Sequence, residues 1–214
     1  MATRAAARLW VLRPWRSSLW RPSRASTRAC RGGVKRVHLI SRHVDGALLL
    51  ELFTHSGIGT MVTQDPLEHL RAATIDDVAS ILSLIEPLEA EGTLVKRSRE
   101  LLEREIDRFL LLEHDGFIVG CAALYPFKTD KAGELACLAV HPDHRNGGAG
   151  ERLIQAVEAQ ARKARMKRLF VLTTRTAHWF VEQGFVEASV EELPEQRQQF
   201  YNYQRRSKVL IKAL

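Results

Sequence analysis

The residues with the most distinctive chemistry lie between Glu134 and Gly150, where an apolar stretch is followed by a proline turn and a loop rich in arginine and glycine. A helix predicted to begin directly after this loop would direct its first backbone N–H groups toward one point, at the positive end of the helix dipole. Glycines at 147, 148 and 150 let a ligand approach without Cβ clashes, and Arg145 can add a charge-assisted hydrogen bond. The spacing predicts a pyrophosphate-binding loop, and an ordinary strand-to-helix connection is the alternative that this stretch alone leaves open.

Apolar periodicity predicts the elements that would position this loop. A strand at 69–73 and two helices that begin near Thr74 and Ser98 precede three consecutive strands, and Thr or Asp within residues 74–77 is the expected cap of the first helix. The loop follows the third of these strands, and a long helix over residues 150–165 follows the loop. Helices that separate only some of the strands indicate an α/β or α+β domain. The other predicted elements are strands at 109–113, 117–125, 134–141, 168–173, 185–190 and 207–212 and a short helix at 177–183.

The net charge of +7 comes from the N-terminal segment. Residues 1–33 contain eight arginines and no Lys, Asp or Glu, which leaves 24 basic against 25 acidic residues in the rest of the chain. The folded part is therefore nearly neutral, and we expect it to bind no nucleic acid. We predict that residues 1–33 are a disordered extension, with a mitochondrial transit peptide as the alternative. Residues 34–66 contain one predicted strand and one short helix that begins with an acidic cap at Asp45, too little to form a stable core alone.

Cysteine usage and hydropathy further limit the class of protein. Cys30, Cys121 and Cys137 form no Cys-x-x-Cys pair, and no His/Cys spacing suits zinc, so we expect a reducing compartment and no metal. No apolar run approaches the length of a membrane span, and the N-terminus lacks the apolar core of a secretory signal. We therefore expect a cytoplasmic protein that does not bind membranes, or a mitochondrial one if the N-terminus is a transit peptide.

The loop and its surroundings resemble a known enzyme family. The spacing Arg145-x-x-Gly148-x-Gly150 after an apolar strand is similar to the acetyl-CoA loop of GNAT acetyltransferases, and so is the order of elements over residues 67–214. This resemblance implies a GNAT fold, in which a mixed, mostly antiparallel sheet flanked by helices splays open to admit acetyl-CoA. Residues 34–66 resemble the end of the amino-acid-kinase domain of bacterial N-acetylglutamate synthases. Five further stretches resemble the acetyltransferase domain of that family: 94–100, 120–125, 133–142, 178–185 and 193–195.

The resemblance also implies how the acetyl donor is bound. The backbones of Leu138, Ala139 and Val140 would pair with the pantetheine arm, and the Val140 N–H would polarise the thioester carbonyl. Acetyl-CoA is thus the expected co-substrate, with no metal. The pyrophosphate would lie on a loop of six residues: Arg145, Asn146, Gly147, Gly148, Ala149 and Gly150.

Catalytic and acceptor-binding residues follow from the same resemblance. Glu134 would deprotonate the substrate ammonium through water, and a lone acid in an apolar strand is costly to bury without a function. Thr173 would protonate the departing CoA thiolate, and a purely structural role fits its position equally well. The residues implied to hold glutamate are Arg97, Arg197 and Arg206, with Arg205 as an alternative to Arg206, and the backbone of Cys137.

Together these assignments predict acetyl transfer from acetyl-CoA to the α-amine of L-glutamate by direct attack, giving N-acetyl-L-glutamate and CoA. In the family that the sequence resembles, this is the first step of arginine biosynthesis. Two alternatives stay open: a GNAT acetyltransferase for another amino-acid or protein amine, and an inactive CoA-binding fragment. L-Glutamate and acetyl-CoA are the expected partners, and a homo-oligomer is left open.

Overall fold

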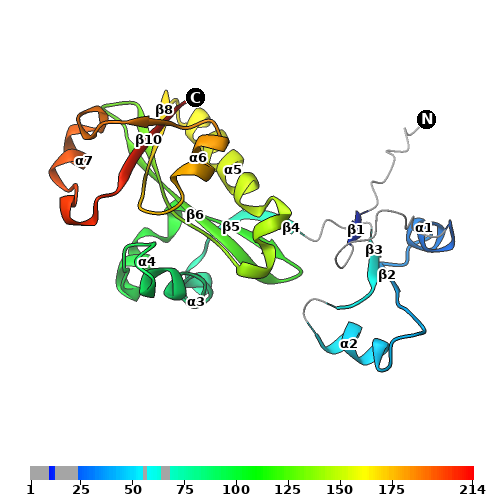
Figure 1. Ribbon diagram of the computed structural model, residues 1–214. Coiled ribbons are helices and arrows are strands. Elements are labelled where there is room, and N and C mark those ends of the chain that lie inside the picture. Colours follow the sequence, from blue (N-terminus) through cyan, green and yellow to red (C-terminus); the bar gives the residue numbers. More distant parts are fainter. Residues whose placement is uncertain (1–9, 13–23, 55–56, 64–67) are drawn as a thin grey trace, which may run out of the picture. The chain divides into compact units, whose positions relative to one another are not determined.

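A computed structural model describes residues 10–12, 24–54, 57–63 and 68–214 of the chain. The chain forms two compact units, Met1–Leu67 and Glu68–Leu214, whose helices and strands are labelled in Figure 1. The N-terminal unit contains a three-stranded antiparallel sheet in the order β1-β3-β2. These strands are β1 (Trp10–Leu12), β2 (Arg36–Leu39) and β3 (Thr60–Thr63).

Two short helices complete the described part of this unit. Helix α1 (Arg24–Arg31) contacts β3, where the Cys30 thiol donates a hydrogen bond to the Val62 carbonyl at 3.2 Å. Helix α2 (Ala47–Phe53) begins after Gly46, which has a left-handed backbone and makes no side-chain cap, so the predicted acidic cap was wrong. Both β1 and α1 lie where the sequence indicated disorder, whereas residues 1–9 and 13–23 of that segment lie outside the described residues.

The second unit is organised around a seven-stranded sheet with the order β4-β5-β6-β7-β8-β10-β9. Every neighbouring pair is antiparallel except β7 and β8, which are parallel and connected through α5 (Ala149–Lys163). This arrangement confirms the mixed, mostly antiparallel sheet that the sequence predicted. The strands are β4 (Glu68–Ala72), β5 (Phe109–His114), β6 (Phe117–Phe127), β7 (Ala132–Val140), β8 (Arg168–Thr173), β9 (Val186–Ala188) and β10 (Lys208–Ala213).

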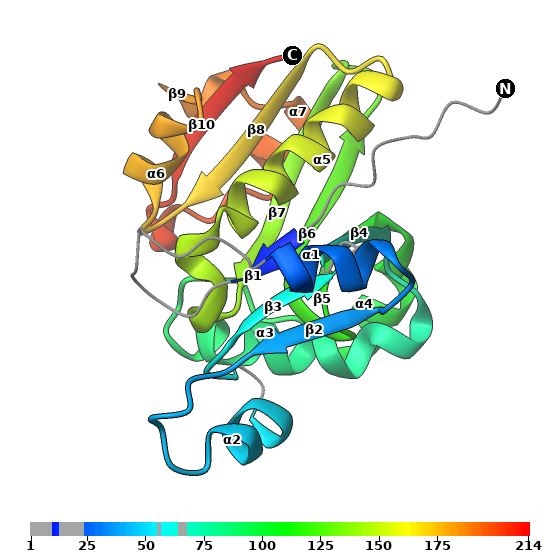
Figure 2. The same cartoon turned by 90° about the vertical axis from the view of Figure 1, so that its right-hand side faces the viewer.

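Helices cover both faces of this sheet (Figures 1 and 2). On one face α5 and α6 bury Leu153, Val157 and Phe180 in the main core. On the other face α3 and α4 bury Ile81 and Leu102 against the middle strands, which leaves the strand ends between the two layers to form a site. The remaining helix bounds are α3 (Val78–Ala90), α4 (Arg99–Glu105), α6 (Ala177–Glu182) and α7 (Glu195–Gln199), the last of which the sequence did not predict.

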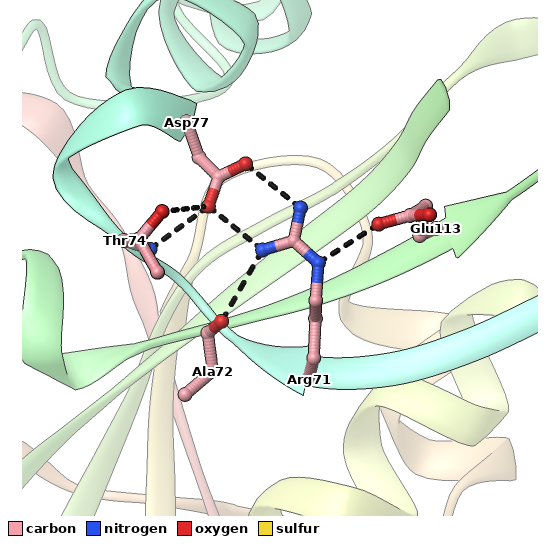
Figure 3. A network of polar contacts seen from close by, with 5 residues as sticks. All are labelled: Arg71, Ala72, Thr74, Asp77 and Glu113. Carbon is pink, nitrogen blue, oxygen red and sulfur yellow. Dashed lines mark hydrogen bonds and ion pairs between the residues drawn. The ribbon is translucent and has the colours of Figure 1, made fainter. Parts of the chain in front are cut away.

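Arg71 on β4 connects the start of α3 to the sheet (Figure 3). Its Nη1 and Nη2 atoms donate to the carboxylate of Asp77 at 2.7 and 2.8 Å, and its Nε donates to Glu113 on β5 at 2.8 Å. Asp77 also accepts hydrogen bonds from the backbone N–H and the hydroxyl of Thr74, which confirms the predicted cap at this helix start. The hydrogen bonds from the Arg71 guanidinium hold the pKa of Asp77 well below its usual range, although burial opposes this shift.

Candidate active site

A cleft opens where β7 and β8 diverge. Backbone pairing between these two strands is confined to Ala132–Glu134 and Arg168–Phe170. Beyond Glu134 the strands enclose a cavity of about 660 Å³, a volume typical of small-molecule sites. The predicted site residues that line it are Cys137, Leu138, Ala139, Val140, Arg145, Gly148, Gly150 and Thr173.

A β-bulge changes the face that the end of β7 presents. Cys137 has a positive φ of 51°, and β7 carries one extra residue there relative to β6. Leu135 packs on the α5 face before the bulge, whereas Leu138 and Val140 do so after it. The extra residue therefore reverses the alternation of side chains between the two faces. Ala139 consequently packs, like Cys137, on the face covered by α3 and α4.

The Val140 N–H is directed toward the cleft. The N–H of His141 donates to the Val119 carbonyl on β6 at 2.8 Å. Because successive backbone groups of a strand point to opposite edges, the N–H of Val140 faces the β8 side, where pairing with β8 has already ended. This geometry suits the predicted role of that N–H as a donor to the thioester carbonyl.

The loop after β7 forms a 3₁₀ turn, Pro142–Gly147, that leads into α5. Gly148 caps α5 with a φ of 76°, a conformation that favours glycine. Gly150 lies against an indole ring, since a Cβ at this position would be 2.9 Å from Cζ2 of Trp179. Arg145 donates from Nε to the Val140 carbonyl at 3.2 Å, so its guanidinium lies at the end of β7 beside the cavity.

Three other residues were predicted for the loop, and none of them is among the described residues that line the cavity. Gly147 belongs to the 3₁₀ turn, and Ala149 is the first residue of α5 and is buried in the core. The side chain of Asn146 lies outside the described atoms. The glycines at 148 and 150 therefore form the part of the loop that the cavity reaches.

Glu134, the last residue of β7 that pairs with β8, forms a two-pronged ion pair with Arg197, and neither residue is among those that line the cavity. Arg197 donates from Nε to Oε2 of Glu134 at 2.7 Å and from Nη2 to Oε1 at 3.2 Å. Its Nη1 donates to the Phe200 carbonyl at 3.1 Å, and the two charged side chains are only 13% and 22% exposed. The structure thus brings both predicted residues together. Arg197 can bind a substrate carboxylate with the same fork only by exchanging it for that of Glu134.

Arg97 lies in an adjacent polar cluster with Tyr125 and Cys137. Burial disfavours the charge of Arg97, but nearby Cys137 and a hydrogen bond with Tyr125 raise its pKa above the ordinary value. Tyr125 pairs in register with Glu134, and its hydroxyl donates to Glu105 at 2.7 Å. Burial and this hydrogen bond raise the pKa of Tyr125 to about 12. Tyr125 therefore lies beside Arg97 and is the cross-strand neighbour of Glu134.

The third predicted arginine is replaced at this cluster by its neighbour. Arg206 is exposed and has a positive φ of 49°. Arg205 instead donates from Nη2 to the carbonyls of Gly92 and Thr93 at 3.0 and 2.7 Å. Burial and the charge of Arg97 lower the pKa of Arg205, which indicates that the two guanidinium groups are close. The structure thus orients Arg205, rather than Arg206, toward Arg97.

Thr173 ends β8 with its hydroxyl at the cavity. Its Oγ1 lies 2.9 Å from Oγ1 of Thr176 and accepts a hydrogen bond from the Thr176 N–H at 3.1 Å. This contact gives Thr173 a structural role at the start of α6, and its predicted role as an acid stays a prediction. Cys137 is buried, and its carbonyl accepts a hydrogen bond from the Cys121 thiol at 3.5 Å.

Sequence reasoning missed Tyr125 and the ion pair between Glu91 and Arg175. Glu91 follows α3, Arg175 follows β8, and their side chains meet at 3.8 Å where both residues line the cavity. For Tyr125 a signal existed, because a tyrosine closes the stretch 120–125 and antiparallel pairing of two predicted strands would place it near Glu134. No comparable signal exists for Glu91 and Arg175, whose contact depends on how two loops pack.

Residues 75–185 match the acetyltransferase (GNAT) family, which amounts to just over half of the chain. The chain belongs to this family. Its GNAT relatives include the amino-acid acetyltransferases of Ralstonia nicotianae, 60% identical over 187 residues, and Azotobacter vinelandii, 60% identical over 190 residues. These matches cover 87% and 89% of the chain but 42% and 44% of the relatives, so the chain spans less than half the length of the curated relatives it matches.

Two solved structures of one enzyme are also similar to the chain. N-acetylglutamate synthase from Neisseria gonorrhoeae complexed with coenzyme A and N-acetyl-glutamate is 46% identical, with a TM-score of 0.68. The same enzyme complexed with coenzyme A and L-arginine is 45% identical, with a TM-score of 0.77. Each match covers 89% of the chain and 45% or 43%, respectively, of the solved chain.

The described residues contain no helix long and apolar enough to cross a membrane. Within the same part of the chain, no cluster of three or more His, Cys, Asp or Glu side chains has a geometry suited to a metal ion. The charged groups at the cleft are instead arginines paired with carboxylates or with backbone carbonyls.

Proposed function

We propose that the chain transfers the acetyl group of acetyl-CoA to the α-amine of L-glutamate, giving N-acetyl-L-glutamate and CoA. The observation that carries the proposal is the buried pair of Glu134 and Arg197, which lies where β7 and β8 diverge. It offers a carboxylate to accept a proton and a guanidinium to bind an acid within one site. Relatives named amino-acid acetyltransferases, and the Neisseria complex with coenzyme A and N-acetyl-glutamate, support the same reaction.

The donor would occupy the cavity between β7 and β8. In this proposal the backbone edge of Leu138 and Val140 pairs with the amides of the pantetheine arm, which replaces the missing pairing with β8. The N–H groups at Gly148 and Gly150 bind the pyrophosphate at the start of α5. Arg145, at the end of β7, adds a positive charge beside the same groups.

Arginines on three segments would hold the acceptor. Arg205 contacts the turn after α3 near Arg97, and Arg197 lies at Glu134, so two positively charged positions flank the proposed amine site. A dicarboxylate such as glutamate can neutralise both positions, whereas an acceptor with one carboxylate leaves one of them uncompensated. Arg206 stays in the proposal as a residue to be compared with Arg205. The backbone of Cys137 would contact the substrate at the bulge.

The chemistry requires one nucleophilic attack and the removal of two protons from the amine nitrogen. Glu134 accepts a proton from the substrate ammonium through water once Arg197 has moved to the substrate carboxylate. The neutral amine then attacks the thioester carbon, forming the C–N bond, while the Val140 N–H stabilises the oxyanion. Collapse breaks the C–S bond, and the departing thiolate takes a proton from the Thr173 hydroxyl, which recovers one from the nitrogen. One proton is released overall, and no covalent enzyme intermediate is needed.

The N-terminal unit belongs to the proposal as well. We infer that residues 34–66 correspond to the end of the domain that precedes the acetyltransferase in its relatives. A match over 187 residues is longer than residues 68–214, so it extends into this unit. Residues 1–33 would then precede the matched part for most of their length.

A thiol-release assay with a panel of amino acids tests the proposal. We expect CoA release with L-glutamate, little with L-glutamine, and N-acetyl-L-glutamate as the product in mass spectrometry. Efficient use of another amine would replace glutamate as the acceptor and leave the acetyltransferase assignment intact. Binding of CoA in calorimetry without turnover of any acceptor would instead identify an inactive CoA-binding fragment.

A further inference from the structure

Arg152, in the first turn of α5, connects the donor loop to the edge of the sheet. Its Nη2 donates to the Gly147 carbonyl at 3.1 Å and to Oε1 of Glu68 at 3.1 Å, and its Nη1 pairs with Oε2 of Glu68. Glu68 begins the edge strand β4, and His114, its partner in register on β5, approaches the same Oε1 to 3.5 Å. The guanidinium is therefore held from one side by a carboxylate that belongs to the sheet.

The hydrogen bond to Gly147 fixes the direction of the next N–H group. A trans peptide unit is planar, so its C=O and N–H point in opposite directions, and the described chain contains no cis peptide bonds. Because the Gly147 carbonyl points toward Arg152, the N–H of Gly148 points away from it. Gly148 lines the cavity and Arg152 does not, so we infer that an N–H pointing away from Arg152 faces the end of the cavity that the loop forms.

The sequence alone does not fix the orientation of the peptide unit between Gly147 and Gly148, so another contact must hold it. The peptide unit joins two glycines, so no Cβ on either side resists its rotation. A Cβ at Gly147 would meet nothing within 4 Å, which shows that packing does not confine the residue either. If the unit turned over, a carbonyl oxygen would face the cavity in place of an N–H and would repel an anion.

We propose that Arg152, held by Glu68, is a positioning residue that orients the Gly148 N–H toward the pyrophosphate of acetyl-CoA. It acts through the loop and touches none of the reacting atoms. The inference rests on donor binding in this cavity, which is part of the proposed function.

The test compares two acetyl donors, of which only acetyl-CoA carries the pyrophosphate. S-Acetylpantetheine carries the thioester arm without the pyrophosphate, so an effect on the loop N–H should appear with acetyl-CoA only. Arg152→Ala should raise the KM for acetyl-CoA and the Kd for CoA about tenfold, the effect of one lost hydrogen bond to a charged group, and leave kcat unchanged. Arg152→Gln should recover part of the affinity because its amide can still donate to Gly147. Glu68→Ala should weaken CoA binding by a smaller factor, because the loop hydrogen bond remains.

Arg162→Ala is the matched control, since Arg162 is half exposed near the far end of the same helix and its pair with Glu158 lies away from the loop. It should bind CoA like the unchanged chain. An unaltered Kd for CoA in folded Arg152→Ala would overturn the inference, as would an equal loss with S-acetylpantetheine. Calorimetry with CoA needs no acceptor, so a failure of glutamate turnover would refute the proposed function separately and leave this comparison valid.

Discussion

Replacing Arg197 by alanine should raise the KM for glutamate and leave kcat and the KM for acetyl-CoA nearly unchanged. A hydrogen bond to a charged group contributes about 1.5 to 3 kcal/mol. Arg197 already donates two such bonds to Glu134, so the loss of the pair with Glu134 offsets part of the free energy gained from a substrate carboxylate. We therefore expect a net loss of about 1 to 2 kcal/mol, or roughly a 5- to 30-fold rise in KM. Arg197→Lys should recover part of this loss, since one ammonium cannot reproduce a two-pronged contact.

Steady-state thiol release, with each substrate varied in turn, measures this change. The control is Arg99→Ala, because Arg99 forms an exposed pair with Glu103 on α4 and should have no effect. Glutamine should be a poor acceptor for the unchanged chain. If Arg197 binds the side-chain carboxylate, its removal should affect glutamine less than glutamate. An unchanged KM for glutamate in Arg197→Ala, or an equal rise in the KM for acetyl-CoA, would refute the carboxylate exchange.

Three further substitutions test the surroundings of the site. Tyr125→Phe removes a hydrogen-bond partner of Arg97 and should raise the KM for glutamate about 5- to 10-fold without changing the KM for acetyl-CoA. An equal rise in the KM for both substrates would contradict this prediction. Asp77→Asn should lower the free energy of unfolding by about 2 to 3 kcal/mol at pH 7, because it weakens the bonds from Arg71. Since the pKa of Asp77 is lowered in the folded state, its stabilisation is complete above the unfolded pKa and declines in acid, so urea unfolding should show a smaller difference at pH 3 than at pH 7; an equal difference would contradict this. Gly148→Ala introduces a side chain at positive φ, which costs about 1 to 2 kcal/mol, and calorimetry should show about tenfold weaker CoA binding, whereas unchanged affinity would contradict the role of this loop.

Most of the second unit could be predicted from its sequence because its signals are local. The strand over residues 168–173 and the capped helix start at Thr74 were confirmed, since apolar periodicity and capping depend on neighbouring residues. Helix α7 was missed because its segment, EQRQQ, has no apolar periodicity and none of its residues is buried. The acidic cap expected for α2 failed because a left-handed Gly46 begins that helix.

The site was less predictable where it depends on contacts between distant segments. Glu134 and Arg197 were each identified, but their mutual ion pair joins residues 63 positions apart and leaves no trace in the spacing. The choice between Arg205 and Arg206 depends on the backbone conformation at 206, which the sequence does not reveal. The bulge at Cys137 was equally hidden, because a positive φ at a cysteine has no sequence signal.

The most direct test of the central claim is the product formed by the unchanged chain from acetyl-CoA and L-glutamate, compared with that of Glu134→Gln. Mass spectrometry should detect N-acetyl-L-glutamate and CoA in equal amounts for the unchanged chain. Turnover by the variant should fall about 10²- to 10⁴-fold, as expected for the loss of a general base, with CoA affinity retained. Absence of N-acetyl-L-glutamate from a chain that binds CoA, or full turnover by Glu134→Gln, would contradict the account.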